Sequence, residues 1–175
     1  MMNLRHWKKV PFPRTPRWAD YDYSRPGAYY VTIATAGRLT TLGRSKEGRI
    51  DLTRIGEIVD GSWLDLAKRF ETVELDSYVV MPDHFHGIIH LNPTVPIRRK
   101  PSGQSPSRPT LMAVIGAFKS LSTIEVNRSQ STPGQKLWQR SFYERVVRND
   151  RELDKFRGYI MNNPAALALQ RSGYR

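Results

Sequence analysis

The sequence of 175 residues contains no cysteine, which excludes disulfide bonds and zinc sites built on thiolates. No apolar run approaches the roughly 20 residues that a helix needs to cross a bilayer. The N-terminal segment lacks the apolar stretch of a secretory signal. We therefore expect no membrane partner and a cytoplasmic protein. The length favours one domain with its own hydrophobic core.

Acidic residues are scarce relative to basic ones. The chain has 16 Asp and Glu against 28 Lys and Arg, which gives a net charge of +12 and an isoelectric point near 10.3. An excess of this size implies a polyanionic partner, and nucleic acid is favoured over an anionic membrane surface. The simpler alternative is that the charge only keeps the protein in solution.

The basic residues gather in two segments that lack regular periodicity. Residues 1–26 read as an irregular arm in which cations alternate with aromatic rings, a combination that can hold phosphates and stack bases. The same rings can instead pack on the folded domain. Residues 92–109 are rich in Pro, Ser and Gly and are predicted to form a mobile basic loop. The predicted DNA-binding residues in the two segments are Arg5, Lys8, Lys9, Arg14, Arg17, Arg98, Arg99 and Lys100.

Hydrophobic periodicity between these segments predicts alternating strands and helices. We expect strands over 27–38, within 43–52, and over 72–81, 84–91 and 137–148. We expect helices from Thr53, over 110–128, and from Asn149 or Asp150 to about 162. Pro164 is expected to end the last helix, because it disfavours helical geometry in the residue before it.

The order of these elements predicts an α+β domain. A strand–helix–strand pair repeated around one sheet favours a ferredoxin-like antiparallel sheet with its helices packed on one face. The domain is expected to span residues 27–167, followed by a short tail over 168–175.

The segment "VVMPDHFHGIIHL", from Val79 to Leu91, contains three of the four histidines in the chain. His84 and His86 follow a Pro-Asp turn on a predicted strand, so they share one face and stand about 6.6 Å apart at the backbone. Two imidazoles at this spacing can converge on one metal ion. Phe85 points to the opposite face, toward the core.

Other interpretations of the histidines remain open. The pair can be half-buried side chains bonded to backbone, and a bulge at Gly87 can change which face each residue occupies. His90 lies about 13 Å from His86 and is expected to be a bystander or an outer contact. A metal hydrolase that activates water is another alternative, but the histidine-triad pattern fails because Ile88 stands where a third histidine is needed.

The last predicted helix carries the second candidate element. Leu153, Phe156 and Ile160 form its buried stripe, with Tyr159 at the border of the stripe and Asn163 one turn further. A phenol has a pKa near 10 and is a poor nucleophile unless it is activated. From the residues alone, nothing separates Tyr159 from the other tyrosines of the chain.

Three motifs in this order resemble the REP-associated tyrosine transposases, relatives of the single-tyrosine HUH transposases. These are "VVMPDHFHGIIHL", "WQRSFYERVVRNDREL" and "YIMNNPAAL", and "YDYSRPGAYYVTIAT" is similar to the N-terminal segment of the family. The resemblance covers about residues 17 to 167. The three motifs together are much more specific than any one of them.

The resemblance implies an enzyme, a metal-dependent single-stranded DNA endonuclease and strand transferase that acts beside hairpins such as REP elements. It implies that His84, His86 and Asn163 bind Mg²⁺ or Mn²⁺ and that Tyr159 is the nucleophile. The tyrosine would become joined to a 5′ phosphate, leaving a free 3′ hydroxyl. A protein of this kind would act in the cytoplasm, associated with the nucleoid.

The alternative is a hairpin-binding protein that keeps the HUH fold without catalysis. The sequence also leaves open whether the active unit is a monomer or a homodimer. It does not reveal the recognised DNA sequence, nor whether Tyr159 serves the histidines of its own chain or those of a partner.

Overall fold

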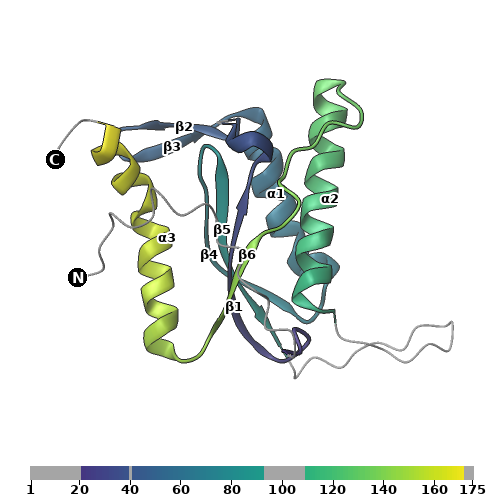
Figure 1. The fold of residues 1–175 in the computed structure, drawn as a ribbon, viewed down its shortest axis with the longest axis vertical. Helices are drawn as coiled ribbons and strands as arrows, with labels where there is room; N and C mark the ends of the chain where they lie inside the picture. Colours follow the sequence, from purple (N-terminus) through teal and green to yellow (C-terminus); the bar gives the residue numbers. More distant parts are fainter. Residues whose placement is uncertain (1–20, 40, 93–108, 172–175) are drawn as a thin grey trace, which may run out of the picture.

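The computed structural model describes residues 21–39, 41–92 and 109–171, and the elements follow the predicted order (Figure 1). The strands are β1 (Gly27–Ala34), β2 (Gly43–Lys46), β3 (Arg49–Leu52), β4 (Val73–Val80), β5 (His84–Leu91) and β6 (Tyr143–Val147). The helices are η2 (Ala36–Arg38), α1 (Arg54–Arg69), α2 (Leu111–Gln130) and α3 (Asp150–Arg171).

Four of the strands form one antiparallel sheet in the order β4-β5-β1-β6. With α1 between β1 and β4 and α2 between β5 and β6, the chain follows the βαββαβ path of the ferredoxin-like fold. The predicted α+β class and antiparallel sheet are therefore confirmed.

The helices cover both faces of this sheet, not one face as we predicted. Helices α1 and α2 pack on the face that carries Tyr29, Val31 and Phe85, where they build the main core. Helix α3 packs on the other face, where Ile160 meets Tyr30 and Ile88 in a smaller cluster. Central strands β1 and β5 carry buried side chains on both sides, so each face has a cover.

Strands β2 and β3 form a separate hairpin, where we expected a turn followed by one strand. Glu47 and Gly48 at its tip both have positive φ, 49° and 77°, as a tight two-residue hairpin turn requires. The hairpin lies beside the C-terminal part of α3 (Figure 1), and Ala165 of that helix approaches the backbone of Gly48.

Helix α3 continues through Pro164, so the predicted end at about Asn162 is wrong. A proline inside a helix removes one backbone hydrogen bond and costs about 3 kcal/mol. The residues of α3 after Pro164 pack on the β2–β3 hairpin, and this contact stabilises the part of the helix that follows the proline. Asn163 consequently stays in helical geometry, on the same helix as Tyr159.

Two predicted strands are shorter than expected. Strand β1 ends at Ala34, because Gly37 adopts a left-handed φ of 64° in the turn η2. Strand β6 begins at Tyr143, whereas Leu137 and Trp138 are buried before it, and Trp138 forms an isolated bridge with Thr35. The Trp138 indole donates to Ser122 of α2, which draws this part of the chain away from the sheet.

Side-chain caps begin the long helices where the sequence predicts them. Thr53 accepts a hydrogen bond from the Gly56 amide, and Asn149 accepts one from the Glu152 amide at 2.9 Å. No helix in the described residues is long and apolar enough to span a membrane.

Candidate functional site

The predicted histidine pair lies at the start of β5, on the face of the sheet that α3 covers. The ring centroids of His84 and His86 are 4.6 Å apart, and Phe85 points into the main core on the opposite face. No bulge occurs at Gly87, because β1 and β5 pair in continuous register along their length. The alternation that the sequence implies is therefore present.

His86 is buried and held through one ring nitrogen. Its Nδ1 lies 2.8 Å from the Tyr30 hydroxyl and 2.8 Å from the Thr32 hydroxyl, both on the neighbouring strand β1. Its Nε2 is buried and has no hydrogen-bond partner among the described residues. Burial lowers the pKa of His86 well below its ordinary value, so the ring is neutral and has a lone pair to offer.

His84 is oriented by the residue before it. Its Nδ1 lies 2.6 Å from a carboxylate oxygen of Asp83, and Arg38 contacts the second oxygen of the same carboxylate at 3.4 Å. Burial alone would raise the pKa of Asp83, but the contacts with His84 and Arg38 lower it overall. The carboxylate therefore occupies Nδ1 of His84 and leaves Nε2 as the ring nitrogen for another partner.

Helix α3 brings Tyr159 against His86 within a single chain. The two ring centroids are 5.3 Å apart in an edge-to-face arrangement. Tyr159 is half-buried at the border of the stripe that contains Phe156 and Ile160. Burial raises the pKa of Tyr159, while a hydrogen bond from the Asn163 side chain opposes that rise. Contacts therefore run from His84 to His86, from His86 to Tyr159, and from Tyr159 to Asn163.

The donor atoms in this series fit a divalent cation. Two imidazoles and an amide oxygen are ligands that Mn²⁺ accepts, and Mg²⁺ takes the oxygen donors more readily. The buried Nε2 of His86 is the observation that favours a cation, because an unpaired buried nitrogen costs about 1 to 3 kcal/mol. In the described parts of the chain, no group of three His, Cys, Asp or Glu side chains could hold a metal ion, at this site or elsewhere, so a cation here would need the Asn163 amide or further ligands.

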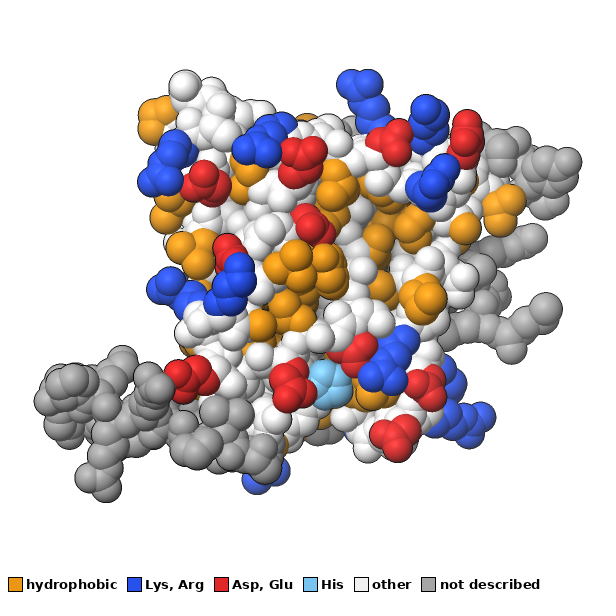
Figure 2. Space-filling model, turned by 180° about the vertical axis from the view of Figure 1, so that it is seen from behind, with side chains coloured by type: hydrophobic (Ala, Val, Ile, Leu, Met, Phe, Trp, Pro, Cys, Tyr) orange, Lys and Arg blue, Asp and Glu red, His pale blue; other side chains and the backbone are white. Residues whose placement is uncertain are grey.

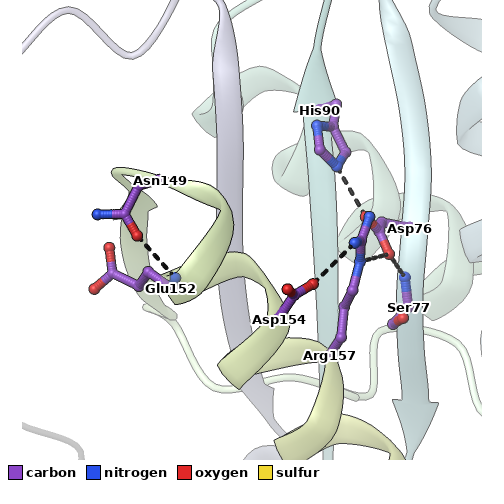
Figure 3. A network of polar contacts seen from close by, with 7 residues as sticks. All are labelled: Asp76, Ser77, His90, Asn149, Glu152, Asp154 and Arg157. Atoms are coloured by element: carbon purple, nitrogen blue, oxygen red, sulfur yellow. Dashed lines mark hydrogen bonds and ion pairs between the residues drawn. The ribbon is translucent and has the colours of Figure 1, made fainter.

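His90 belongs to a different network on the same face of the sheet. Its Nε2 contacts Asp76 at 2.9 Å, and Asp76 also accepts hydrogen bonds from Arg157 of α3, the shortest at 2.7 Å (Figure 3). Asp76 lies at an irregularity of β4 between Leu75 and Tyr78. The network therefore connects α3 to the sheet. His90 contacts Asp76 and not His84 or His86, so it lies outside the histidine pair.

All eight predicted DNA-binding residues lie outside the described residues. Ten of the 28 Lys and Arg, but only one of the 16 Asp and Glu, fall in the undescribed segments 1–20, 93–108 and 172–175. The rest of the chain is nearly balanced in charge. Figure 2 agrees, since one face shows hydrophobic side chains in the middle with acidic and basic groups mixed around them.

The aromatic end of the predicted arm is partly described. Tyr21 and Tyr23 pack against the main core, with their ring centroids 6.5 and 6.3 Å from that of Tyr29. For these two rings the structure supports packing on the domain over contact with bases.

Sequence reasoning missed Tyr30 and Thr32, which contact His86 from β1. The alternation of "AYYVTIA" places them on one face of that strand, which was a usable signal. Without the pairing of β1 with β5, however, nothing indicates that this face meets the histidines.

No protein-family model matches the chain. A protein of Haemophilus influenzae (strain Rd), described only as uncharacterised, is 26% identical over 171 residues, which covers 93% of this chain and 94% of the relative. Among solved structures, a REP-associated tyrosine transposase bound to a REP hairpin is similar with a TM-score of 0.59 and 20% identity. That match covers 84% of this chain and 72% of the transposase.

A second solved structure is a proposed transposase of Deinococcus radiodurans R1. It is 22% identical with a TM-score of 0.45, over 82% of this chain and 93% of that protein. The similarity that carries weight is the first one, which extends over most of both chains. The chain therefore has the fold of a REP-associated tyrosine transposase, and the resemblance that its motifs predicted is confirmed at the level of the fold.

Proposed function

We propose that this protein is a transposase-like enzyme, a metal-dependent endonuclease and strand transferase that cuts single-stranded DNA beside a hairpin. Tyr159 is the nucleophile, and His84, His86 and Asn163 are the metal ligands. The observation that carries the proposal is the 5.3 Å approach of Tyr159 to His86, from elements far apart in the sequence. A tyrosine, two histidines and an amide collected in one place are the parts that phosphotyrosine chemistry needs.

The reaction is a transesterification that conserves one phosphodiester bond. The Tyr159 oxygen attacks the scissile phosphorus and forms a tyrosyl–phosphate bond, while the bond from phosphorus to the preceding 3′ oxygen breaks. The phenol releases its proton, and the departing oxygen gains one to become a 3′ hydroxyl. Because the energy of the broken ester is retained, attack by a 3′ hydroxyl reverses the step without a nucleotide cofactor.

The pKa of Tyr159 explains why the phenol needs help. Burial raises that pKa, so the hydroxyl is protonated near neutral pH, and the Asn163 hydrogen bond counteracts the rise. A divalent cation bound by His84 and His86, Mg²⁺ or Mn²⁺, would supply positive charge to the phosphate and the attacking oxygen.

Two further observations support a DNA substrate. The net charge of +12 suits a polyanion, and most of the excess falls in residues 1–20 and 93–108. We propose that the arm and the loop grip the backbone and that 27–167 form the catalytic domain. The structurally similar transposase was solved with a REP hairpin, which makes hairpin DNA the first substrate to test. A DNA substrate of this kind implies a cytoplasmic, nucleoid-associated protein.

The decisive experiment is capture of the covalent adduct. End-labelled hairpin oligonucleotides with single-stranded flanks are incubated with the protein and Mn²⁺, then separated under denaturing conditions. We expect a protein–DNA band with the wild type and none with Tyr159→Phe, although that variant still shifts the oligonucleotide in a native gel. Tyr143→Phe is the matched control, because Tyr143 lies on the same side of the sheet and contacts Tyr30, with ring centroids 6.4 Å apart.

Three outcomes would contradict parts of the proposal. An adduct formed by Tyr159→Phe would assign the nucleophile elsewhere. Binding without any adduct in the wild type would favour the non-catalytic hairpin-binding alternative. Cleavage that survives Tyr159→Phe without an adduct would favour a hydrolase that uses water.

A further inference from the structure

The hydroxyl groups of Tyr30 and Thr32 meet a single nitrogen of His86. The distances from Nδ1 are 2.8 Å to each hydroxyl, and Thr32 donates to the Tyr30 oxygen at 3.2 Å, which closes a triangle of contacts. All three side chains are at most 3% exposed. A polar cluster this dry costs free energy unless its members pair closely, so the triangle holds the ring in one orientation.

From this triangle we propose that Tyr30 and Thr32 are positioning residues that aim Nε2 of His86 at the cation. The inference rests on the proposed function and names residues that support its metal site. With Nδ1 occupied on the β1 side, Nε2 is the nitrogen left for a ligand bond, and it is buried with no hydrogen-bond partner in the described parts of the chain.

Hydroxyl groups suit this task because each can donate or accept a hydrogen bond. When Nε2 binds a cation, Nδ1 must carry the ring proton and needs an acceptor. When Nε2 carries the proton, Nδ1 needs a donor. Tyr30 and Thr32 satisfy either arrangement without moving the ring.

Tyr30 also connects the histidine to the helix that carries Tyr159. Its ring stacks on Phe156 of α3 with centroids 4.4 Å apart and an interplanar angle of 11°. It meets the Tyr159 ring edge-on at 6.3 Å. One side chain on β1 thus supports His86 through its hydroxyl and α3 through its ring, and the two roles can be separated by substitution.

The experiment measures Mn²⁺ binding directly, by isothermal titration calorimetry or by the electron paramagnetic resonance of free Mn²⁺, beside the adduct assay. Thr32→Val and Tyr30→Phe remove one hydroxyl each and keep the shape of the core. We expect each to weaken Mn²⁺ binding by about 10- to 100-fold, the usual effect of removing a group that orients a metal ligand. Thr32→Ser retains the hydroxyl and should restore binding close to that of the wild type.

Two further variants separate positioning from general damage. Tyr29→Phe is the matched control: it removes the hydroxyl of the preceding residue on the opposite sheet face, where it donates to the Arg25 carbonyl at 2.7 Å. It should leave Mn²⁺ binding unchanged. Phe156→Leu removes the stacked ring but no hydroxyl, so it should slow adduct formation while Mn²⁺ binding stays within about threefold of the wild type. Circular dichroism and urea unfolding verify that each variant is folded.

The results distinguish the two proposals. If the wild type binds Mn²⁺ and forms the adduct but Thr32→Val and Tyr30→Phe bind Mn²⁺ equally well, the positioning role is wrong and the proposed function stands. If the wild type neither binds Mn²⁺ nor forms an adduct, both proposals fail. Non-additive losses in the double variant would support the positioning role further, because both hydroxyls act on the same nitrogen.

Discussion

The two faces of the four-stranded sheet are built from neighbouring residues but have different chemistry. The face under α1 and α2 is filled by large apolar side chains such as Trp63, Phe85 and Phe118. The face under α3 has a small apolar cluster around Ile160, flanked by His86 with its two hydroxyl partners and by the ion pair of Asp76 with Arg157. The face under α1 and α2 contributes most of the apolar burial that stabilises the fold. The face under α3 buries fewer apolar side chains and holds polar groups in fixed orientations.

The largest expected difference is in the loss of stability when Phe85 or His86 is replaced. These two residues are adjacent in sequence and point to opposite faces of the sheet. Phe85→Ala should lower the free energy of unfolding by about 3 to 5 kcal/mol, because it opens a cavity against Trp63 and Phe118. His86→Ala should cost less stability but abolish Mn²⁺ binding and the adduct. Urea unfolding at pH 7, with the adduct assay beside it, checks both. Equal losses of stability would show that the two faces are not distinct.

Gly87 provides a smaller test of the apolar face. A Cβ atom at this position would lie 2.6 Å from the Trp63 ring and 2.8 Å from the Phe85 ring. Both neighbours are fully buried, so they have little room to move. Gly87→Ala should therefore destabilise the protein by about 1 to 3 kcal/mol through overpacking. Gly61→Ala on α1, where no atom lies within 4 Å of the added group, is the control and should not destabilise. Unchanged stability of Gly87→Ala would mean that this face is loosely packed.

The smallest effect on stability is expected from substitution of Asp76, on the face under α3. Hydrogen bonds from Arg157 hold the pKa of Asp76 well below its ordinary value of 3.8. The ion pair therefore stabilises the fold fully above about pH 4, and its contribution is lost as the pH falls further. Asp76→Asn should lower stability by about 1 kcal/mol at pH 7, since Arg157 is partly exposed.

The difference in the free energy of unfolding between the wild type and Asp76→Asn should become smaller when urea unfolding is repeated at pH 3. Asp154→Asn is the control from the same network, because the Asp154 side chain is 73% exposed and contacts Arg157 at 3.3 Å. It should change stability little at either pH. If the difference in free energy of unfolding is the same at pH 7 and pH 3, Asp76 is not ionised in the folded protein as proposed.

Several parts of the site could be predicted from local sequence. Strand alternation places His84 and His86 opposite Phe85, and helical spacing places Tyr159 at the border of a buried stripe. The side-chain caps of α1 and α3 were visible as Thr53 and Asn149. Each of these features depends on the geometry of one element, which residues near in sequence determine.

Other parts could not be predicted, because they depend on which elements meet. The persistence of α3 beyond Pro164 reflects packing on the β2–β3 hairpin, which outweighs the local preference of proline. The shortening of β6 reflects the burial of Trp138 against α2. In both places a tertiary contact worth a few kcal/mol overrides a local preference of similar size.

By itself the sequence determined which side chains share a face of each strand or helix, the excess of positive charge and the motifs that resemble the REP-associated tyrosine transposases. Only the tertiary structure decided that α3 covers the histidine face, that Tyr30 and Thr32 meet Nδ1 of His86, and that Tyr159 reaches the same histidine. The physical reason is that the backbone repeat orients side chains locally. The partner of each face is chosen by burial, which acts between segments far apart in the chain.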